Sequence, residues 1–225
     1  MHTTAGAEES APMVPGFELG RRIGHGATSE VWVAATEADG RRVALKVVHA
    51  DLDEVQAAAR EAALSAAVAS PHLVRIEACL PLPGGRVALV MPHLAGGSLE
   101  ALVEARGHLE PGEVVTVLAP VASALARLHA VGVVHGDVSP GNVLLDLDGR
   151  PHLGDLGVGR IVGEAPAGVW GSDGYVAPEV VLGSDPSPAA DVYSLGALGW
   201  LCLTGSVPGA PGLRPALADV AGAAA

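Results

Sequence analysis

Apolar and polar residues alternate along much of residues 17–91. A period of two is typical of strands that bury one face. Turn residues separate the alternating segments, with glycines at 24 and 26, Asp39-Gly40, and Pro83-Gly84-Gly85. The pattern predicts strands over 17–24, 30–37, 41–49, 73–79 and 86–91.

Other segments carry apolar residues at helical spacing. Residues 53–69 predict a helix that ends before Pro71. A long helix is expected from Pro111 to Gly132, because apolar residues recur there at steps of three and four, at Val114, Leu118, Val121, Leu125 and Leu128. The apolar stretch 192–203 is too short to span a bilayer and predicts a buried core helix.

These elements predict an α+β fold with two lobes. Residues 1–16 are expected to be a disordered tail, and residues 17–91 a β-rich lobe. Residues 92–97 would form a hinge, and residues 98–225 a mainly helical lobe.

Composition narrows the class of protein. The net charge is -12 and the sequence contains no basic cluster, which argues against nucleic-acid binding. The N-terminal residues have no apolar core, so we expect no signal peptide and a cytoplasmic location. Cys79 and Cys202 lie far apart in apolar contexts, without metal or redox spacing, and are interpreted as two buried thiols in a reducing compartment.

Lys46 is the only lysine in the chain, although twelve arginines are present. It lies in an apolar run, Val43-Ala44-Leu45-Lys46, where a solvated surface charge is not expected. A compact ammonium suits a phosphate oxygen in a narrow site. The glycines at 24 and 26 precede it by about twenty residues, and their backbone amides could approach phosphates, although two glycines in a turn are also typical of an ordinary hairpin.

Several carboxylates add to this pattern. Glu61 falls on the apolar face of its helix and needs a partner, for which Lys46 is the economical candidate; a Glu at the edge of the buried face is the alternative. Asp137 and Asn142 lie five residues apart after the long helix, and Asp155 follows an expected hairpin. Oxygen ligands of this kind suit Mg²⁺ together with phosphates.

The combination resembles the eukaryotic-like, bacterial-type Ser/Thr protein kinases. His135-Gly136-Asp137 with Asn142, Asp155-Leu156-Gly157 and the stretch 171–179 are similar to landmarks of that family in their order. The segment that begins Asp191-Val192-Tyr193-Ser194 is similar to its buried helix with a supporting aspartate. The resemblance implies a two-lobed kinase fold and ATP-dependent transfer of the γ-phosphoryl group to Ser/Thr hydroxyls of proteins, with ATP and Mg²⁺ as cofactors.

The resemblance also implies residue roles. Lys46, tethered by Glu61, would hold the α- and β-phosphates, Asp137 would accept the proton of the substrate hydroxyl, and Ser172 would help to form the acceptor site near Asp137. Asn142 and Asp155 would hold Mg²⁺. The ATP-binding residues would include Lys46 together with Ile23, Gly24, Gly26, Val31, Ala44, Met91, Pro92, Leu94 and Leu144.

Four departures from the family pattern bear on activity. Gly136 replaces an arginine that normally receives a phosphate, and residues 158–170 contain no Ser, Thr or Tyr, so we expect no switch by phosphorylation there. Ser139 replaces a lysine that stabilises the transferring phosphate, which predicts slower chemistry. Leu156 replaces a phenylalanine, a conservative apolar change.

The fourth departure is the short C-terminal lobe. The chain ends soon after Gly205, where the family continues for further helices, so the lobe is expected to be incomplete. Glu179 would then be partly buried without its usual arginine, for which Arg214 is a weak substitute. Helix 192–203 would expose apolar surface that a partner or a missing segment could cover.

Two alternatives stay open. Ser139, Gly136 and the short C-terminus favour a nucleotide-binding pseudokinase or scaffold with weak or no transfer. A small-molecule phosphotransferase shares the His-Gly-Asp loop but lacks the Ala-Pro-Glu stretch present here at 177–179. The protein substrate, the pathway and the oligomeric state do not follow from the sequence.

Overall fold

The structure is a computed structural model. It describes residues 11–26, 28–48, 52–156, 160–161, 172–209 and 216–217. The chain divides into two compact units, residues 1–58 with 77–93 and residues 59–76 with 94–225. Strands dominate the first unit and helices the second, as expected for an α+β fold.

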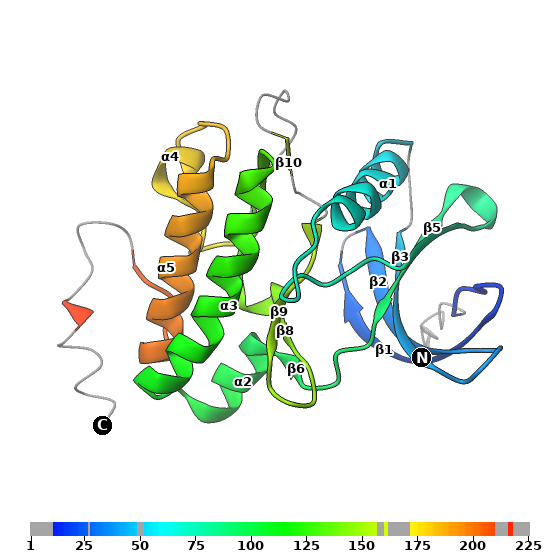
Figure 1. The fold of residues 1–225 in the computed structure, drawn as a ribbon, viewed down its shortest axis with the longest axis horizontal. Helices are drawn as coiled ribbons and strands as arrows, with labels where there is room; N and C mark the ends of the chain where they lie inside the picture. Colours follow the sequence, from blue (N-terminus) through cyan, green and yellow to red (C-terminus); the bar gives the residue numbers. More distant parts are fainter. Residues whose placement is uncertain are drawn as a thin grey trace, which may run out of the picture. The chain divides into compact units, whose positions relative to one another are not determined.

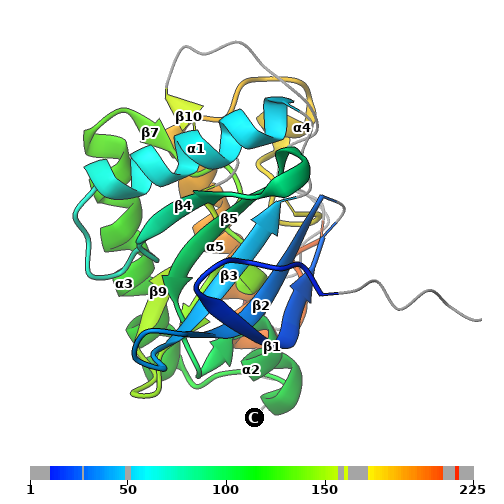
Figure 2. The same ribbon diagram turned by 90° about the vertical axis from the view of Figure 1, so that its right-hand side faces the viewer.

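The first unit contains a five-stranded antiparallel sheet in the order β1-β2-β3-β5-β4 (Figure 2). Its core lies on one face, where alternate residues such as Ala34, Val43 and Leu45 pack together. A short 3-10 turn, η1 (Pro83–Gly85), joins the last two strands along the chain. The strands are β1 (Phe17–His25), β2 (Ser29–Thr36), β3 (Arg42–Val48), β4 (Ala78–Pro81) and β5 (Val87–Pro92).

Four of the five strand predictions are confirmed, and the strand over 73–79 is wrong. Residues 73–76 satisfy their backbone groups in the second unit instead of in the sheet. Val74 N donates to Leu153 O (2.8 Å), and Ile76 N donates to Ser65 Oγ (2.8 Å). The chain reaches β5 only at Glu77, whose N donates to Val90 O (2.8 Å), and β4 pairs with β5 from Ala78.

Helix α1 (Leu52–Ala67) confirms the first helical prediction. Ala58, Glu61 and Ser65 are buried, at the three- and four-residue spacing of one helix face. Ser65 connects the end of the helix to the segment that follows it, because its hydroxyl lies between Ile76 N and Val74 O.

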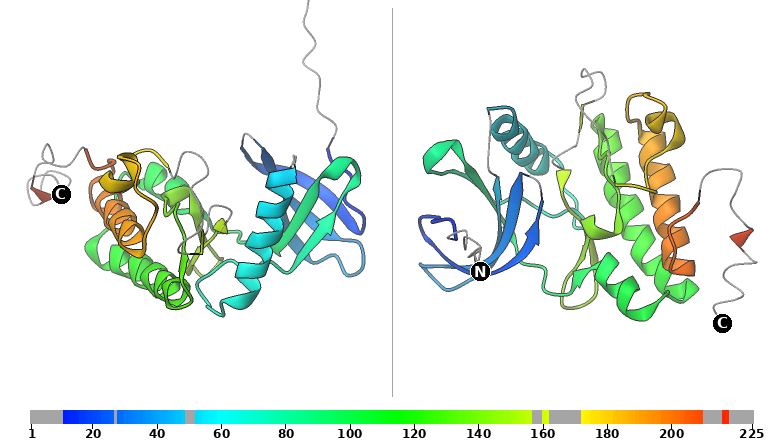
Figure 3. Two further views of the ribbon diagram at one scale, coloured as in Figure 1. Left: turned by 90° about the horizontal axis from the view of Figure 1, so that it is seen from above. Right: turned by 180° about the vertical axis from the view of Figure 1, so that it is seen from behind.

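The second unit is built around two long helices, α3 (Pro111–Ala130) and α5 (Pro188–Thr204), which lie side by side (Figures 1 and 3). The same unit also contains helix α2 (Leu99–Arg106) and the short helix α4 (Pro178–Val181). The remaining elements are β6 (Gly97–Ser98), β7 (Val133–Val134), the 3-10 turn η2 (Pro140–Asn142), β8 (Val143–Leu145), β9 (Pro151–Leu153) and β10 (Arg160–Ile161).

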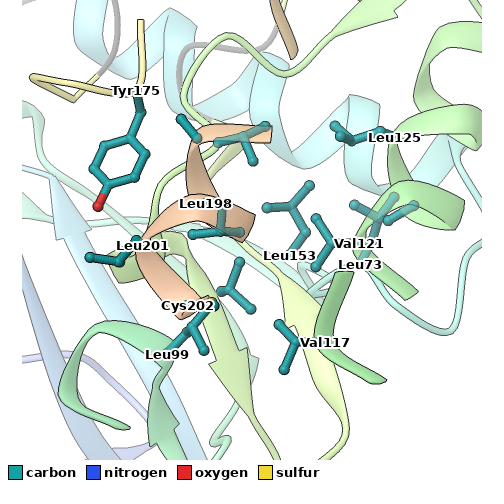
Figure 4. Close-up of a cluster of buried hydrophobic side chains, with 14 of the residues drawn as sticks. Leu73, Leu99, Val117, Val121, Leu125, Leu153, Tyr175, Leu198, Leu201 and Cys202 are labelled. Atoms are coloured by element: carbon teal, nitrogen blue, oxygen red, sulfur yellow. The ribbon is translucent and has the colours of Figure 1, made fainter. Parts of the chain in front are cut away.

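The core of this unit confirms the apolar stripe of the long helix (Figure 4). Val121 and Leu125 of α3 pack with Leu198 of α5 and Leu153 of β9, and all four side chains are at most 2% exposed. By length and composition alone, α3 is the one helix in the described residues that could cross a membrane. Its buried face packs in this core.

Helix α5 confirms the prediction of a buried helix over 192–203 and is longer at its N-terminal end. Ser187 caps it by accepting from Ala190 N (3.2 Å), and Gly205 ends it with a left-handed φ of 70°. Val192 stays 61% exposed, so apolar surface is open on this helix, as expected.

The expectation of a partly buried Glu179 is wrong. Glu179 lies in the first turn of α4, and its side chain is exposed. An exposed carboxylate is solvated and needs no arginine partner. Arg214, the suggested partner, lies outside the described residues.

The prediction of two buried thiols is half wrong. Cys202 is fully buried, whereas Cys79 is exposed because it points outward from β4, an edge strand with alternating burial. The two cysteines therefore differ in accessibility, and burial raises the pKa of the Cys202 thiol to about 11.

We expect a thiol reagent at pH 8 to modify Cys79 in the native protein and Cys202 only after unfolding. A pKa two units above the ordinary value makes the Cys202 thiolate about 100-fold rarer, and burial also blocks access. The measurement is the number of thiols titrated with and without denaturant, with Cys79→Ser as the control that should leave none reactive in the native state. Because the folded pKa is raised, the stability contribution of this thiol should fall as pH rises above 9.

Candidate functional site

The glycine-rich segment forms the turn between β1 and β2. Gly24 pairs with Val31 and His25 with Glu30, and Gly26 N donates to Ser29 O (2.7 Å) to close the turn. Ile23 is 42% exposed at the end of this hairpin. Ala27, at its tip, lies outside the described residues.

Strand register brings the other ATP-binding candidates of the first unit onto one face of the sheet. Lys46 pairs with Val31, and Ala44 pairs with Met91. Cross-strand partners project from the same face, opposite to the face that holds the core. Lys46, Val31 and Met91 are half-buried there, so this face offers an apolar surface with one ammonium group.

The remaining ATP-binding candidates are divided between the two units. Pro92 ends β5, where it pairs with Val43, and Leu94 is half-buried just after it. Leu144 lies in β8 of the second unit, where it pairs with Ser98 and His152. The contacts proposed between these residues and a nucleotide remain predictions.

Glu30 is a buried carboxylate that the sequence reasoning missed. It is 5% exposed, and its Oε1 accepts from Arg22 Nη1 (3.1 Å) while its Oε2 accepts from Trp32 Nε1 (3.0 Å). The Arg22 guanidinium also lies 5.9 Å from the centroid of the Trp32 ring. Glu30 thus ties β1 to β2 beside the glycine-rich turn. Its alternation with Trp32 and Ala34 along one face of β2 was the available signal.

Glu61 lies in the second unit and is 4% exposed on α1. The prediction that it projects toward the apolar side of its helix is confirmed. Its ion pair with Lys46 stays a prediction.

The candidate catalytic loop is held together by hydrogen bonds to Asp137. Asn142 Nδ2 donates to Asp137 Oδ2 (2.8 Å) and to Asp137 O (2.9 Å). Ser172 donates to Asp137 Oδ1 through both its backbone N–H (2.9 Å) and its hydroxyl (2.8 Å). The expected proximity of Ser172 to Asp137 is therefore present, and both oxygens of one carboxylate are oriented by fixed donors.

A second carboxylate anchors the backbone just before this loop. Asp191, 1% exposed, accepts from His135 N and Gly136 N (each 2.9 Å), and its Oδ2 lies 2.7 Å from His129 Nε2. His135 is itself fully buried, with Nε2 3.0 Å from Gly154 O. These contacts attach the loop to α5 and to the start of the Asp155 segment.

The backbone conformation at position 136 favours glycine, which is a second reason why no arginine stands there. Its φ is 79°, a left-handed conformation that costs a residue with a β-carbon about 1–2 kcal/mol. Ser139 stands where the family has a lysine. It is uncharged and 5% exposed, so this position supplies no cation to the site. Leu156 is buried at 4% in the core of the second unit, as an apolar replacement should be.

Asp155 is the one described residue other than glycine that has a positive φ, at 57°. Strained backbone of this kind is concentrated at functional sites. Gly154 N, immediately before it, donates to Asn142 O (2.8 Å), which connects the two candidate metal ligands through the backbone.

The residues present fit a magnesium ion that is also bound by phosphates. Among the described residues, no group of three or more His, Cys, Asp or Glu side chains is placed to hold a metal by itself. Mg²⁺ does not need one, because it usually takes one or two protein ligands and completes its shell with phosphate and water oxygens. Asn142 donates to Asp137 through its amide nitrogen, which leaves its Oδ1 as a potential ligand alongside the exposed carboxylate of Asp155.

The segment expected to lack phosphorylation, 158–170, lies outside the described residues except for the backbone of β10, which pairs with β7. The absence of a phosphate switch there stays a prediction from the sequence.

Comparison with known proteins identifies the family. The protein kinase domain family matches residues 17–212. Serine/threonine-protein kinase PknK of Mycobacterium tuberculosis is 41% identical over 196 residues, covering 84% of this chain and 18% of PknK. PknA of the same species is 34% identical over 204 residues, covering 85% of this chain and 47% of PknA. A probable kinase, pknA2 of Bifidobacterium longum, is 32% identical over 212 residues, covering 89% of this chain and 28% of that protein.

The chain thus spans less than half the length of each of these relatives. The family match covers both the strand-rich and the helical elements, including the loop around Asp137 and the Lys46 strand. With that coverage and these hydrogen-bonded landmarks, the chain belongs to the protein kinase family.

Proposed function

We propose that this chain transfers the γ-phosphoryl group of ATP to Ser or Thr hydroxyls of proteins. The observation that carries the proposal is the orientation of Asp137 by Asn142 and by both donors of Ser172. A carboxylate fixed in this way can accept the proton of an incoming hydroxyl and hold that hydroxyl in line with the phosphate.

Each unit would contribute its own part of the reaction. In the first, the Lys46 ammonium would hold phosphate oxygens, with Val31, Ala44 and Met91 against the adenine. In the second, Asn142 and Asp155 would hold Mg²⁺, which neutralises negative charge on the transferred group when it is bound. Ser172 donates to the Oδ1 oxygen of Asp137, so an incoming hydroxyl would share or replace that bond.

A nucleotide-binding protein with weak transfer is the second candidate, and Ser139 favours it. The family's lysine would place a cation near the transferred phosphate, and Ser139 is buried and uncharged. Loss of one such donor slows catalysis about 10²–10³-fold. The two candidates therefore differ in rate and agree on nucleotide binding.

The test is transfer of label from Mg-[γ-³²P]ATP to a generic protein substrate or to the chain itself. We expect measurable transfer by wild type, and loss of transfer in both Lys46→Met and Lys46→Arg, because a planar guanidinium does not reproduce the compact ammonium. Arg86→Met is the matched control, since the exposed Arg86 side chain donates to Pro83 O (3.2 Å) in the turn between β4 and β5 and is not among the proposed ATP-binding residues, and it should retain activity.

Nucleotide binding measured in parallel separates the outcomes. Mg-dependent ATP binding without transfer by wild type would favour the second candidate. Transfer that survives Lys46→Met would contradict the role of Lys46, and folded wild type that neither binds ATP nor transfers would overturn the proposal.

A further inference from the structure

A hollow of about 380 Å³ lies in the first unit, outside the proposed nucleotide residues. It occupies the end of the sheet where β1, β2 and β3 meet the residue that follows β5. None of the proposed ATP-binding residues lines it. Its lining is formed by Glu18, Leu19, Gly20, Arg21, Val33, Ala34, Ala35, Arg42 and His93.

The register explains why most of these residues share one face, whereas Leu19 and Ala34 pack in the core on the other face. Glu18 pairs with Ala35, and Ala35 pairs with Arg42. Val43 pairs with Pro92, so His93 comes next to Arg42 on the neighbouring strand. The small side chain of Ala35 leaves space between Glu18 and Arg42, whose Cα atoms are two strand spacings, about 10 Å, apart.

A β-bulge brings the second arginine to the hollow. Leu19 pairs with Ala34 and Arg22 with Trp32, so Gly20 and Arg21 together face Val33. Such a bulge redirects a side chain that regular pairing would place elsewhere. Arg21 consequently lines the hollow, while its neighbour Arg22 is used in the Glu30 ion pair.

The charges in the hollow are predominantly positive. Within the described part of the chain, neither Arg21 nor Arg42 forms an ion pair, although Arg41 beside them is paired with Glu77 (2.7 Å). Burial, then the charges of Arg42 and Arg21, lower the pKa of His93. The hollow therefore holds two guanidinium groups and one carboxylate, Glu18, with which neither arginine forms an ion pair in the described residues. This is notable in a chain of net charge -12.

We propose that this hollow binds a small organic acid, with its carboxylate between Arg21 and Arg42 and its apolar body over Val33 and Ala35. A guanidinium presents paired donors that match a carboxylate. A volume of about 380 Å³ has room for a small organic molecule. This site is distinct from the proposed transfer of phosphate and does not depend on it.

The experiment titrates the full chain with benzoate and follows the ring proton signals of His93 by NMR, assigned by their loss in His93→Gln. Benzoate should shift these signals and raise the pKa of His93, because its charge offsets those of Arg21 and Arg42. Benzamide, which has the same shape without the charge, should do neither. Arg42→Gln should weaken benzoate binding about tenfold, the scale of a hydrogen bond to a charged group.

Arg86→Gln is the matched control, since it removes the same charge from the same unit outside the hollow, and it should bind benzoate as wild type does. Equal shifts with benzamide, or equal losses in Arg86→Gln and Arg42→Gln, would overturn the site. Inorganic phosphate that binds as tightly as benzoate would overturn its assignment to an organic acid. Thermal melting of each variant verifies folding, and Arg21→Gln gives an independent second variant.

Discussion

Replacing Asp191 by asparagine is expected to lower the free energy of unfolding by about 3 kcal/mol. Asp191 is 1% exposed and accepts from two backbone N–H groups, with His129 Nε2 also in contact. Asparagine puts an NH₂ group in place of one oxygen, so at least one of these donors would face another donor in a buried site. For a chain of this size, the melting temperature should fall by roughly 6–12 °C.

The same substitution should also remove phosphoryl transfer, because His135 and Gly136 immediately precede Asp137. Melting followed by circular dichroism, together with the transfer assay below the new melting temperature, measures both effects. Asp148→Asn is the matched control, since the Asp148 side chain is 72% exposed in a surface pair with Arg150. Exposed pairs contribute little, and this variant should stay within about 0.5 kcal/mol of wild type. Equal melting of the two variants would show that the buried contacts contribute no net stability.

Periodicity predicted most elements of this fold because, in a strand or an amphipathic helix, the apolar residues that recur on one face are the residues that become buried. It located the apolar stripe of α3 and the buried side of Glu61. It failed at 73–79, where the local pattern resembles a strand but the backbone bonds to Leu153 and Ser65, partners that are distant in sequence. The apolar residues around Cys79 predicted a buried thiol, because they do not reveal that β4 is an edge strand.

The candidate site was likewise predicted in part. Resemblance to the family suggested that Ser172 lies near Asp137, although the two are separated by 35 residues. Glu30 escaped notice because a carboxylate in a strand usually faces solvent, and only the structure shows that Arg22 and Trp32 enclose it. The left-handed backbone at Gly136 was not predicted either, because the absence of a phosphate to bind was already a sufficient explanation for a glycine in place of the arginine.

Asp137→Asn is expected to reduce kcat for phosphoryl transfer about 10³-fold, within the range for loss of a positioned general base. Asparagine cannot accept the hydroxyl proton at neutral pH. Its Oδ1 can keep accepting from the two donors of Ser172, and Asn142 Nδ2 can keep its bond to the backbone O of Asp137, so only the bond from Asn142 to Oδ2 is lost. The fold and the KM for ATP should therefore change little, since Asp137 is not among the proposed ATP-binding residues.

That split between kcat and KM distinguishes a base from a residue that only supports the loop. Steady-state transfer with varied ATP measures it, and Asp185→Asn, an exposed aspartate between α4 and α5, is the control that should behave as wild type. If Asp137→Asn raised the KM for ATP and left kcat intact, Asp137 would be serving the nucleotide rather than the hydroxyl. A near-normal rate would mean that the substrate hydroxyl loses its proton elsewhere, and the donors around Asp137 would then need a structural explanation alone.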